Sequence, residues 1–181
     1  MQKGYTELPM TAFRRPTNIR DILVRSTTPP NDSSGFKPCN TPQCKTCPYT
    51  SSASSFRSST NGRVFNITLN LSCHSHNIIN LITCTKCNKY IGKTKKSLRT
   101  RFTSHRFEIN NDRGTSVAKH FNIDDHTSQH VNIIAIDQLP GSDNISLLNK
   151  ETHWFHTLGT TEPHGMNIKE QESFPISIRF K

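Results

Sequence analysis

The stretch that decides the fold is Asn77-Ile78-Ile79-Asn80-Leu81-Ile82-Thr83-Cys84, followed after a short gap by Lys89-Tyr90-Ile91-Gly92. Both runs are short and apolar, and they contain many β-branched or aromatic residues, which is typical of β-strands. The residues Cys84 to Asn88 between them are polar and few. The sequence therefore predicts two strands joined by a tight turn.

Periodic segments follow this pair of strands. Leu98, Phe102 and Ile109 share one stripe of a helical pattern, and Thr115 or Ser116 suits the N-cap of a shorter helix. The expected elements are helix, short helix, strand and helix, at Lys95–Ile109, Thr115–Phe121, Val131–Ile136 and Asn144–Leu158. This order predicts an α+β fold in which helices cover a small antiparallel sheet.

The chain before residue 77 has a different composition. Residues 1–35 are basic and contain Pro29-Pro30, so we expect a linker or docking segment. Residues 36–76 hold four of the six cysteines and a serine-rich stretch, Thr50–Thr60, which cannot build a core alone. Arg63–Leu71 alternates like a strand. We expect a zinc-stabilised module at 36–76, a domain at 77–170 and a tail at 171–181.

Charge favours an anionic partner. Lysine and arginine number 23 against 13 acids, a formal net charge of +10 over 181 residues. Nucleic acid is the commonest partner for such a chain, and an anionic membrane surface is the alternative. No apolar run is long enough to span a membrane, so we expect no membrane partner. No apolar leader is visible at the first residues, so we expect the cysteines to be reduced.

Two sets of cysteines have the spacing of metal ligands. Cys84 and Cys87 form C-x2-C, half of a tetrahedral site, and His120 with His126 is the nearest second half, with His130 in reserve. The alternative is a buried Cys84 with surface histidines.

The second set lies upstream. Cys39, Cys44 and Cys47 form C-x4-C-x2-C, and Cys73, or else His74 or His76, would complete that site. One disulfide with two unpaired cysteines is the alternative. We expect one or two structural Zn²⁺ ions.

A further group of residues suits phosphate chemistry. Arg101 and His105 lie four apart on the expected helix, so both point to one side, close to the strand that holds Tyr90. A guanidinium can hold a phosphate oxygen through two hydrogen bonds, and Gly92 permits a close approach. Glu151, on the last helix, is a suitable ligand for Mg²⁺ or Mn²⁺, although it also fits an ordinary surface position.

These blocks, together with Leu98-x-x-Arg101-x-x-x-His105, Glu151-x-x-Trp154 and Pro163-His164-Gly165-Met166-Asn167, resemble the GIY-YIG endonuclease domain. The chain resembles in particular the form of this domain that is found in Penelope-like retroelements, in which a C-x2-C lies between the two signature strands. The resemblance covers residues 77 to 167. It implies a three-stranded antiparallel sheet flanked by helices, DNA as substrate, nuclear localisation and a reverse transcriptase upstream in the same polyprotein.

The resemblance also implies roles for individual residues. Tyr90 would be the phenol near the attacking water, Arg101 would neutralise the scissile phosphate, His105 would hydrogen-bond at the site and Glu151 would hold the divalent ion. Expected DNA contacts come from the basic residues around the second strand and from the late asparagine: Lys93, Lys95, Lys96, Arg99 and Asn167.

One position departs from the family pattern. The first signature strand should end in a tyrosine, and Asn80 stands there. An amide can hold a water but cannot take its proton at neutral pH. The sequence therefore leaves two functions open: an endonuclease in which Tyr90, His105 or bulk hydroxide assists the attack, and a catalytically decayed, zinc-dependent DNA-binding module.

Overall fold

The computed structural model describes residues 34–87, 89–123, 125–141 and 143–168. The expected tail at 171–181 and nearly all of the expected docking segment at 1–35 lie outside these residues. The described residues belong to one compact unit, Asp32–Lys181.

The centre of this unit is a three-stranded antiparallel sheet with the order β6-β5-β7, formed by β5 (Ile78–Cys84), β6 (Lys89–Thr94) and β7 (Val131–Gln138). All three expected strands are confirmed. β5 lies in the middle and all but one of its residues are buried, which explains its continuous apolar run. β6 is an edge strand.

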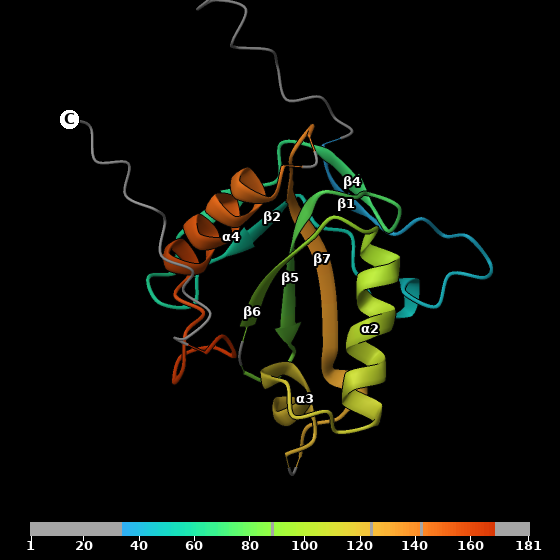
Figure 1. Cartoon of the computed structure of the whole chain (residues 1–181), viewed down its shortest axis with the longest axis vertical. Coiled ribbons are helices and arrows are strands. Elements are labelled where there is room, and N and C mark those ends of the chain that lie inside the picture. Colours follow the sequence, from blue (N-terminus) through green and yellow to red (C-terminus); the bar gives the residue numbers. More distant parts are fainter. Residues whose placement is uncertain (1–33, 88, 124, 142, 169–181) are drawn as a thin grey trace, which may run out of the picture. The chain divides into compact units, whose positions relative to one another are not determined.

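Helices flank the sheet on two sides (Figure 1). α4 (Asn144–Leu158) packs on β6 and β5, whereas α2 (Leu98–Asn110) contacts β7 and the short helix α3 (Ser116–Phe121). Thr115 is the N-cap of α3, as one of the two expected candidates. The α+β class, the small antiparallel sheet and the three α-helices among the described residues confirm the coarse prediction.

The buried stripes agree with the sequence for one helix and differ for the other. Leu98, Phe102 and Ile109 of α2 are buried as expected. On α4 the sequence pattern suggests Ile145, Leu148, Phe155 and Leu158 as the apolar positions. Phe155 and Leu158 are buried, but Ile145 is 66% exposed and Leu147 is buried instead. Ile145 is the second residue of that helix, in the first turn that Asp143 caps.

The Cys-rich segment contributes to the same hydrophobic core as the sheet. The expected strand Arg63–Leu71 is wrong in one respect, because the structure divides it between β3 (Val64–Asn66) and β4 (Asn70–Ser72). β3 pairs with β2 (Ser55–Arg57) in a hairpin, and β4 pairs in parallel with β1 (Gly35–Lys37). The chain crosses from one ladder to the other at Ile67, whose N–H bonds back to Ser54.

Apolar side chains of this segment are buried within one cluster that also includes the sheet: Phe36, Phe56, Ile67 and Leu71. The segment 36–76 therefore adds apolar packing of its own, which its serine content did not predict. No helix among the described residues has the length and hydrophobicity of a membrane span.

Candidate functional site

The edge strand β6 and helix α2 bring the expected Tyr90, Asn80 and His105 together. Tyr90 pairs with Ile82 and Gly92 pairs with Asn80, and residues paired across a ladder point to the same face. α2 lies on that face, because the imidazole of His105 meets the ring of Tyr90 with centroids 5.8 Å apart. A register shift next to Asn80, on the β7 side, marks a local β-bulge.

Gly92 is required by the closeness of these groups. A Cβ at this position would lie 2.8 Å from a ring carbon of Tyr90, 3.3 Å from its hydroxyl oxygen and 3.4 Å from Nδ2 of Asn80. Any side chain would displace the phenol. We expected Gly92 to let another group approach the backbone closely, and in the structure the phenol of Tyr90 is that group.

Buried polar atoms without a hydrogen-bond partner are concentrated here. Among the described residues they include both amide atoms of Asn80, Nε of Arg101 and both ring nitrogens of His105. Buried polar groups are normally satisfied, and leaving one unpaired costs about 1–3 kcal/mol. Five such atoms on three neighbouring side chains are typical of a site that binds a polar or charged ligand.

Two groups of the site are neutral at pH 7. Burial, together with the Arg101 guanidinium, lowers the pKa of His105 to about 3. Its Nδ1 lies 3.3 Å from Oε2 of Glu108, but no hydrogen bond joins the two atoms, and the imidazole carries no charge at that pKa. Burial also raises the pKa of Tyr90, an effect that Arg101 opposes and the Glu151 carboxylate reinforces. The charges of Arg101 and Glu151 therefore both act on the phenol.

Glu151 reaches this edge from the other face of the sheet. Lys93 follows Gly92 in β6, so its side chain points to the opposite face of the sheet, on which α4 packs. Its Nζ lies 2.5 Å from Oε2 of Glu151. We expected the side chains of Tyr90, Arg101, His105 and Glu151 to meet in one groove on one side of the sheet. The structure corrects this for Glu151, which is held by Lys93 on the α4 face, opposite to the face of Tyr90 and His105. Its carboxylate still acts on the phenol, because it raises the pKa of Tyr90.

Lys93 was expected to contact phosphate, and in this structure its ammonium pairs with Glu151. The other expected DNA contacts around β6, namely Lys95, Lys96 and Arg99, are exposed in the loop and first turn that lead into α2.

The role expected for Asn167 is corrected by the structure. Its side chain is 2% exposed, its Oδ1 accepts from the backbone N–H of Ile91 at 2.9 Å, and its Nδ2 donates to the carbonyl of Ile91 at 2.8 Å. The amide therefore substitutes for a neighbouring strand and cannot contact DNA. Met166 continues this pairing through its N–H to the carbonyl of Lys89.

Asn167→Ala should therefore destabilise the fold. Both polar groups of the buried Ile91 lose their partner, so we expect a loss of about 2–4 kcal/mol in the free energy of unfolding. Urea unfolding measures this loss. Asn122→Ala is the matched control, since that exposed amide donates to Ile109 and should cost less than about 1 kcal/mol. Equal losses for the two variants would contradict the bracing role of Asn167.

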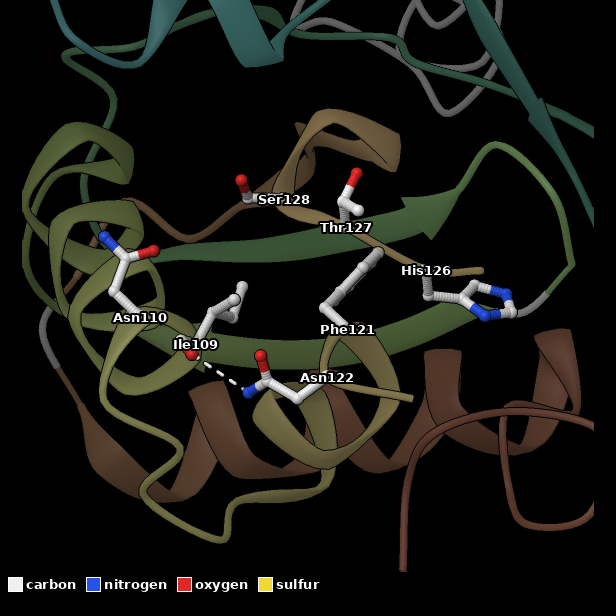
Figure 2. Close-up of a pocket in the computed structure, with 7 residues that line it drawn as sticks. All are labelled: Ile109, Asn110, Phe121, Asn122, His126, Thr127 and Ser128. Carbon is white, nitrogen blue, oxygen red and sulfur yellow. Dashed lines mark hydrogen bonds between the residues drawn. The ribbon is translucent and has the colours of Figure 1, made fainter. Parts of the chain in front are cut away.

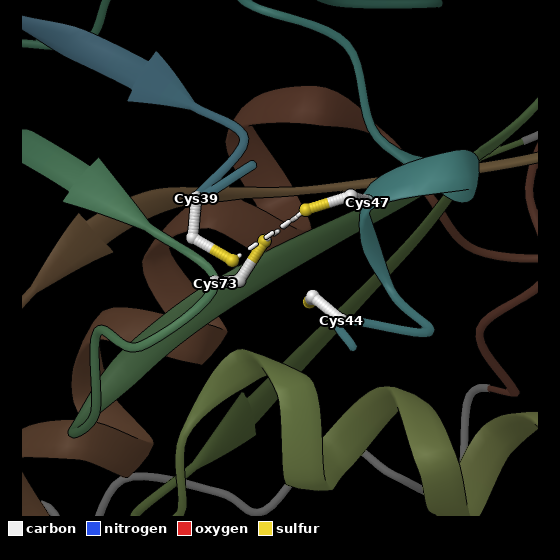
Figure 3. A group of neighbouring side chains, drawn as sticks. All are labelled: Cys39, Cys44, Cys47 and Cys73. Carbon is white, nitrogen blue, oxygen red and sulfur yellow. Dashed lines mark hydrogen bonds between the residues drawn. The ribbon is translucent and has the colours of Figure 1, made fainter. Parts of the chain in front are cut away.

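The first set of cysteines forms a four-sulfur cluster (Figure 3). Cys39 follows β1, Cys44 and Cys47 come from the next loop and the 3-10 helix η1 (Cys47–Tyr49), and Cys73 follows β4. Their sulfurs lie within 4.8 Å of one another, with Cys39–Cys47 at 3.5 Å and Cys47–Cys73 at 3.8 Å. Zinc with bonds of about 2.3 Å holds its sulfurs about 3.8 Å apart. The cluster can hold a metal ion and is consistent with structural zinc.

The second cluster joins the β5–β6 turn to the region around α3. Sγ of Cys87 lies 3.4 Å from Nε2 of His120 and 3.2 Å from Nε2 of His126, and Cys84 completes the group. Burial and the neighbouring His126 lower the pKa of His120, which favours the neutral imidazole that a metal needs. This cluster can also hold a metal ion. No disulfide joins any two of the six cysteines, so the disulfide alternative is not seen among them.

A separate hollow of about 300 Å³ lies where α2 and α3 end (Figure 2). The side chain of Asn122 lines this hollow and donates to the carbonyl of Ile109 at 2.9 Å. Its lining includes the metal-cluster residue His126 but no acidic or cationic side chain. It therefore offers no charge for a phosphate, in contrast to the edge of β6.

Comparisons with protein-family models, curated proteins and solved structures found no significant match to this chain.

Proposed function

We propose that this protein is a metal-dependent nuclease that hydrolyses phosphodiester bonds. The observation that supports the proposal best is the group of buried, unpaired polar atoms of Asn80, Arg101 and His105 around Tyr90. A phosphate with its attacking water offers both donors and acceptors to such a group. The carboxylate of Glu151 at the same edge supplies the oxygen ligand that a divalent ion of the magnesium type prefers.

More particularly, we propose a GIY-YIG endonuclease of the Penelope-like retroelement type that nicks DNA. The support is the ordered set of residues that resembles this family, placed on an antiparallel sheet with flanking helices. Nuclear localisation and a reverse transcriptase in the same polyprotein belong to this proposal, and both rest on the resemblance alone.

In the proposed mechanism, Arg101 holds the scissile phosphate and offsets its charge. The neutral imidazole of His105 and the neutral phenol of Tyr90 hydrogen-bond the attacking water, and the amide of Asn80 orients it. The water oxygen attacks phosphorus, the bond to the leaving oxygen breaks, and the proton of the attacking water passes to solvent hydroxide. The leaving alkoxide takes a proton from solvent water, which regenerates the hydroxide. A divalent ion held by Glu151 would stabilise charge on the leaving oxygen.

Arg101→Ala tests this function by separating rate from affinity. We expect nicking of a supercoiled plasmid with magnesium to slow by about 10²–10³-fold, because one charged donor to the transition state is removed. Affinity for DNA should change only a few-fold, since the net charge falls by one. An equal loss in rate and affinity would mean that Arg101 only contributes to a binding surface.

A decayed DNA-binding module is the second candidate function. Asn80 favours it, because a fully buried amide replaces the family's first tyrosine and cannot accept a proton from water. DNA binding by the wild type without magnesium-dependent nicking would support this candidate over the enzyme.

A further inference from the structure

The hairpin formed by β2 and β3 is anchored beside the edge strand at three points. Oγ of Ser58 donates to the carbonyl of Leu158 at 3.4 Å, at the end of α4. A Cβ on Gly159 would lie 2.2 Å from Cγ2 of Thr60, so the hairpin turn packs directly against that glycine. The ammonium of Lys89, the first residue of β6, donates to the backbone carbonyl of Arg57. The hairpin therefore presents its side chains in fixed positions.

Two cations meet at this junction. Arg57 is exposed and Lys89 is half-buried, and the Lys89 ammonium lies against the backbone carbonyl of Arg57. Neither side chain takes part in an ion pair among the described residues. Each donates to a backbone carbonyl, Arg57 to Gly62 and Lys89 to Arg57, and each has further donors to offer. The repulsion between them favours an anionic ligand.

The turn of the same hairpin lines a polar hollow of about 490 Å³ through Ser59 and Thr60. Cys87, Pro163 and His164 complete its lining. Two hydroxyls and an imidazole can donate hydrogen bonds there, and no acidic residue lines it. Hydroxyls, cations and open access suit a sugar-phosphate backbone.

We propose that the β2–β3 hairpin and the start of β6 form a binding surface for the DNA backbone, in which Arg57 and Lys89 contact phosphates to one side of the cleavage point. This inference rests on the proposed function and adds the place where the DNA backbone would bind. Lys89 and Lys93 lie four residues apart on the same face of β6, about 13 Å along the strand. That length corresponds to roughly four nucleotides at about 3.4 Å per step.

The test measures affinity for a fluorescent 30-base-pair duplex by anisotropy at several salt concentrations, without magnesium and without a chelator that would remove structural zinc. We expect Arg57→Ala combined with Lys89→Ala to lower affinity about tenfold or more. The slope of log affinity against log salt should fall by about two, because each lost phosphate contact removes about 0.9. Arg57→Lys with Lys89→Arg should keep the wild-type slope.

Arg113→Ala is the matched control, since this exposed cation between α2 and α3 contacts Phe107. It should change the slope by less than half a unit. An unchanged slope in the double alanine variant, in protein with wild-type zinc content and urea midpoint, would overturn the inference. Binding to phosphatidylserine vesicles in place of DNA would also overturn it.

Failure of the proposed function has a different result. A wild type that never nicks DNA, combined with the expected loss of slope in the double alanine variant, would retain the binding surface and refute the enzyme. Normal nicking by the wild type, combined with an unchanged slope in the double alanine variant, would support the enzyme and refute the binding surface.

Discussion

Replacement of Glu151 by alanine should abolish magnesium-dependent nicking, with a loss of about a thousandfold or more in rate. Glu151 is the carboxylate at the edge of β6, and a bound divalent ion contributes several kcal/mol to the transition state. The measurement is plasmid nicking over a magnesium titration. Glu151→Gln should lose as much as Glu151→Ala, because the amide keeps the shape but loses the charge.

Asp112→Asn is the control for the loss of one negative charge. Asp112 is exposed after the end of α2 with a φ of 44°, and asparagine tolerates this left-handed conformation. This variant should nick like the wild type. If Glu151→Ala nicks as fast as the wild type at every magnesium concentration, the catalytic assignment is wrong.

Removal of metal from the four-cysteine cluster should have the largest effect on stability. Structural zinc contributes on the order of 10 kcal/mol in small metal-dependent modules, and for a chain of this size about 1 kcal/mol shifts the melting temperature by about 2–4 °C. Chelation should therefore lower the melting temperature by about 20 °C or more. Cys44→Ser, which removes one sulfur of this cluster only, should reproduce part of that shift.

Hydrogen exchange should show where unfolding begins. We expect the amides of residues 36–76 to lose protection first on chelation, before those of the central sheet. The first turn of α2 should follow them, because Leu98 N–H donates to Ser75 and Arg99 N–H donates to Cys73. Identical melting and exchange in zinc-loaded and metal-free protein would contradict a structural metal at this cluster.

The cysteine clusters illustrate how far spacing alone can predict a site. C-x2-C at Cys84 and Cys87 required a second pair within reach, and the structure places His120 and His126 there. Cys73 was one of three candidates for the fourth ligand of the other set. The parallel pairing of β4 with β1 selects it, because that pairing brings the ends of both strands to the same point.

Asn167 and the hairpin show what sequence patterns could not predict. The residue type of Asn167 matched a family position, but its bond partners are backbone groups 76 residues away. Likewise, the serine-rich composition of residues 50–60 gave no sign that Arg57 would meet Lys89. Both contacts depend on which segment lies outside the edge strand, and no local periodicity encodes that choice.

By itself the sequence determined the type and order of the sheet and helix elements from residue 77 onward, since short continuous apolar runs and period-3.6 burial leave a local pattern in the chain. It also determined the C-x2-C and C-x4-C-x2-C parts of the two candidate metal clusters, because that spacing is local, whereas the pairing of β4 with β1 selected Cys73. Only the tertiary structure decided that Glu151 reaches the site from the opposite face of the sheet, and that Asn167 braces the edge strand. These arrangements arise from packing between distant segments, whose free energy depends on the whole core.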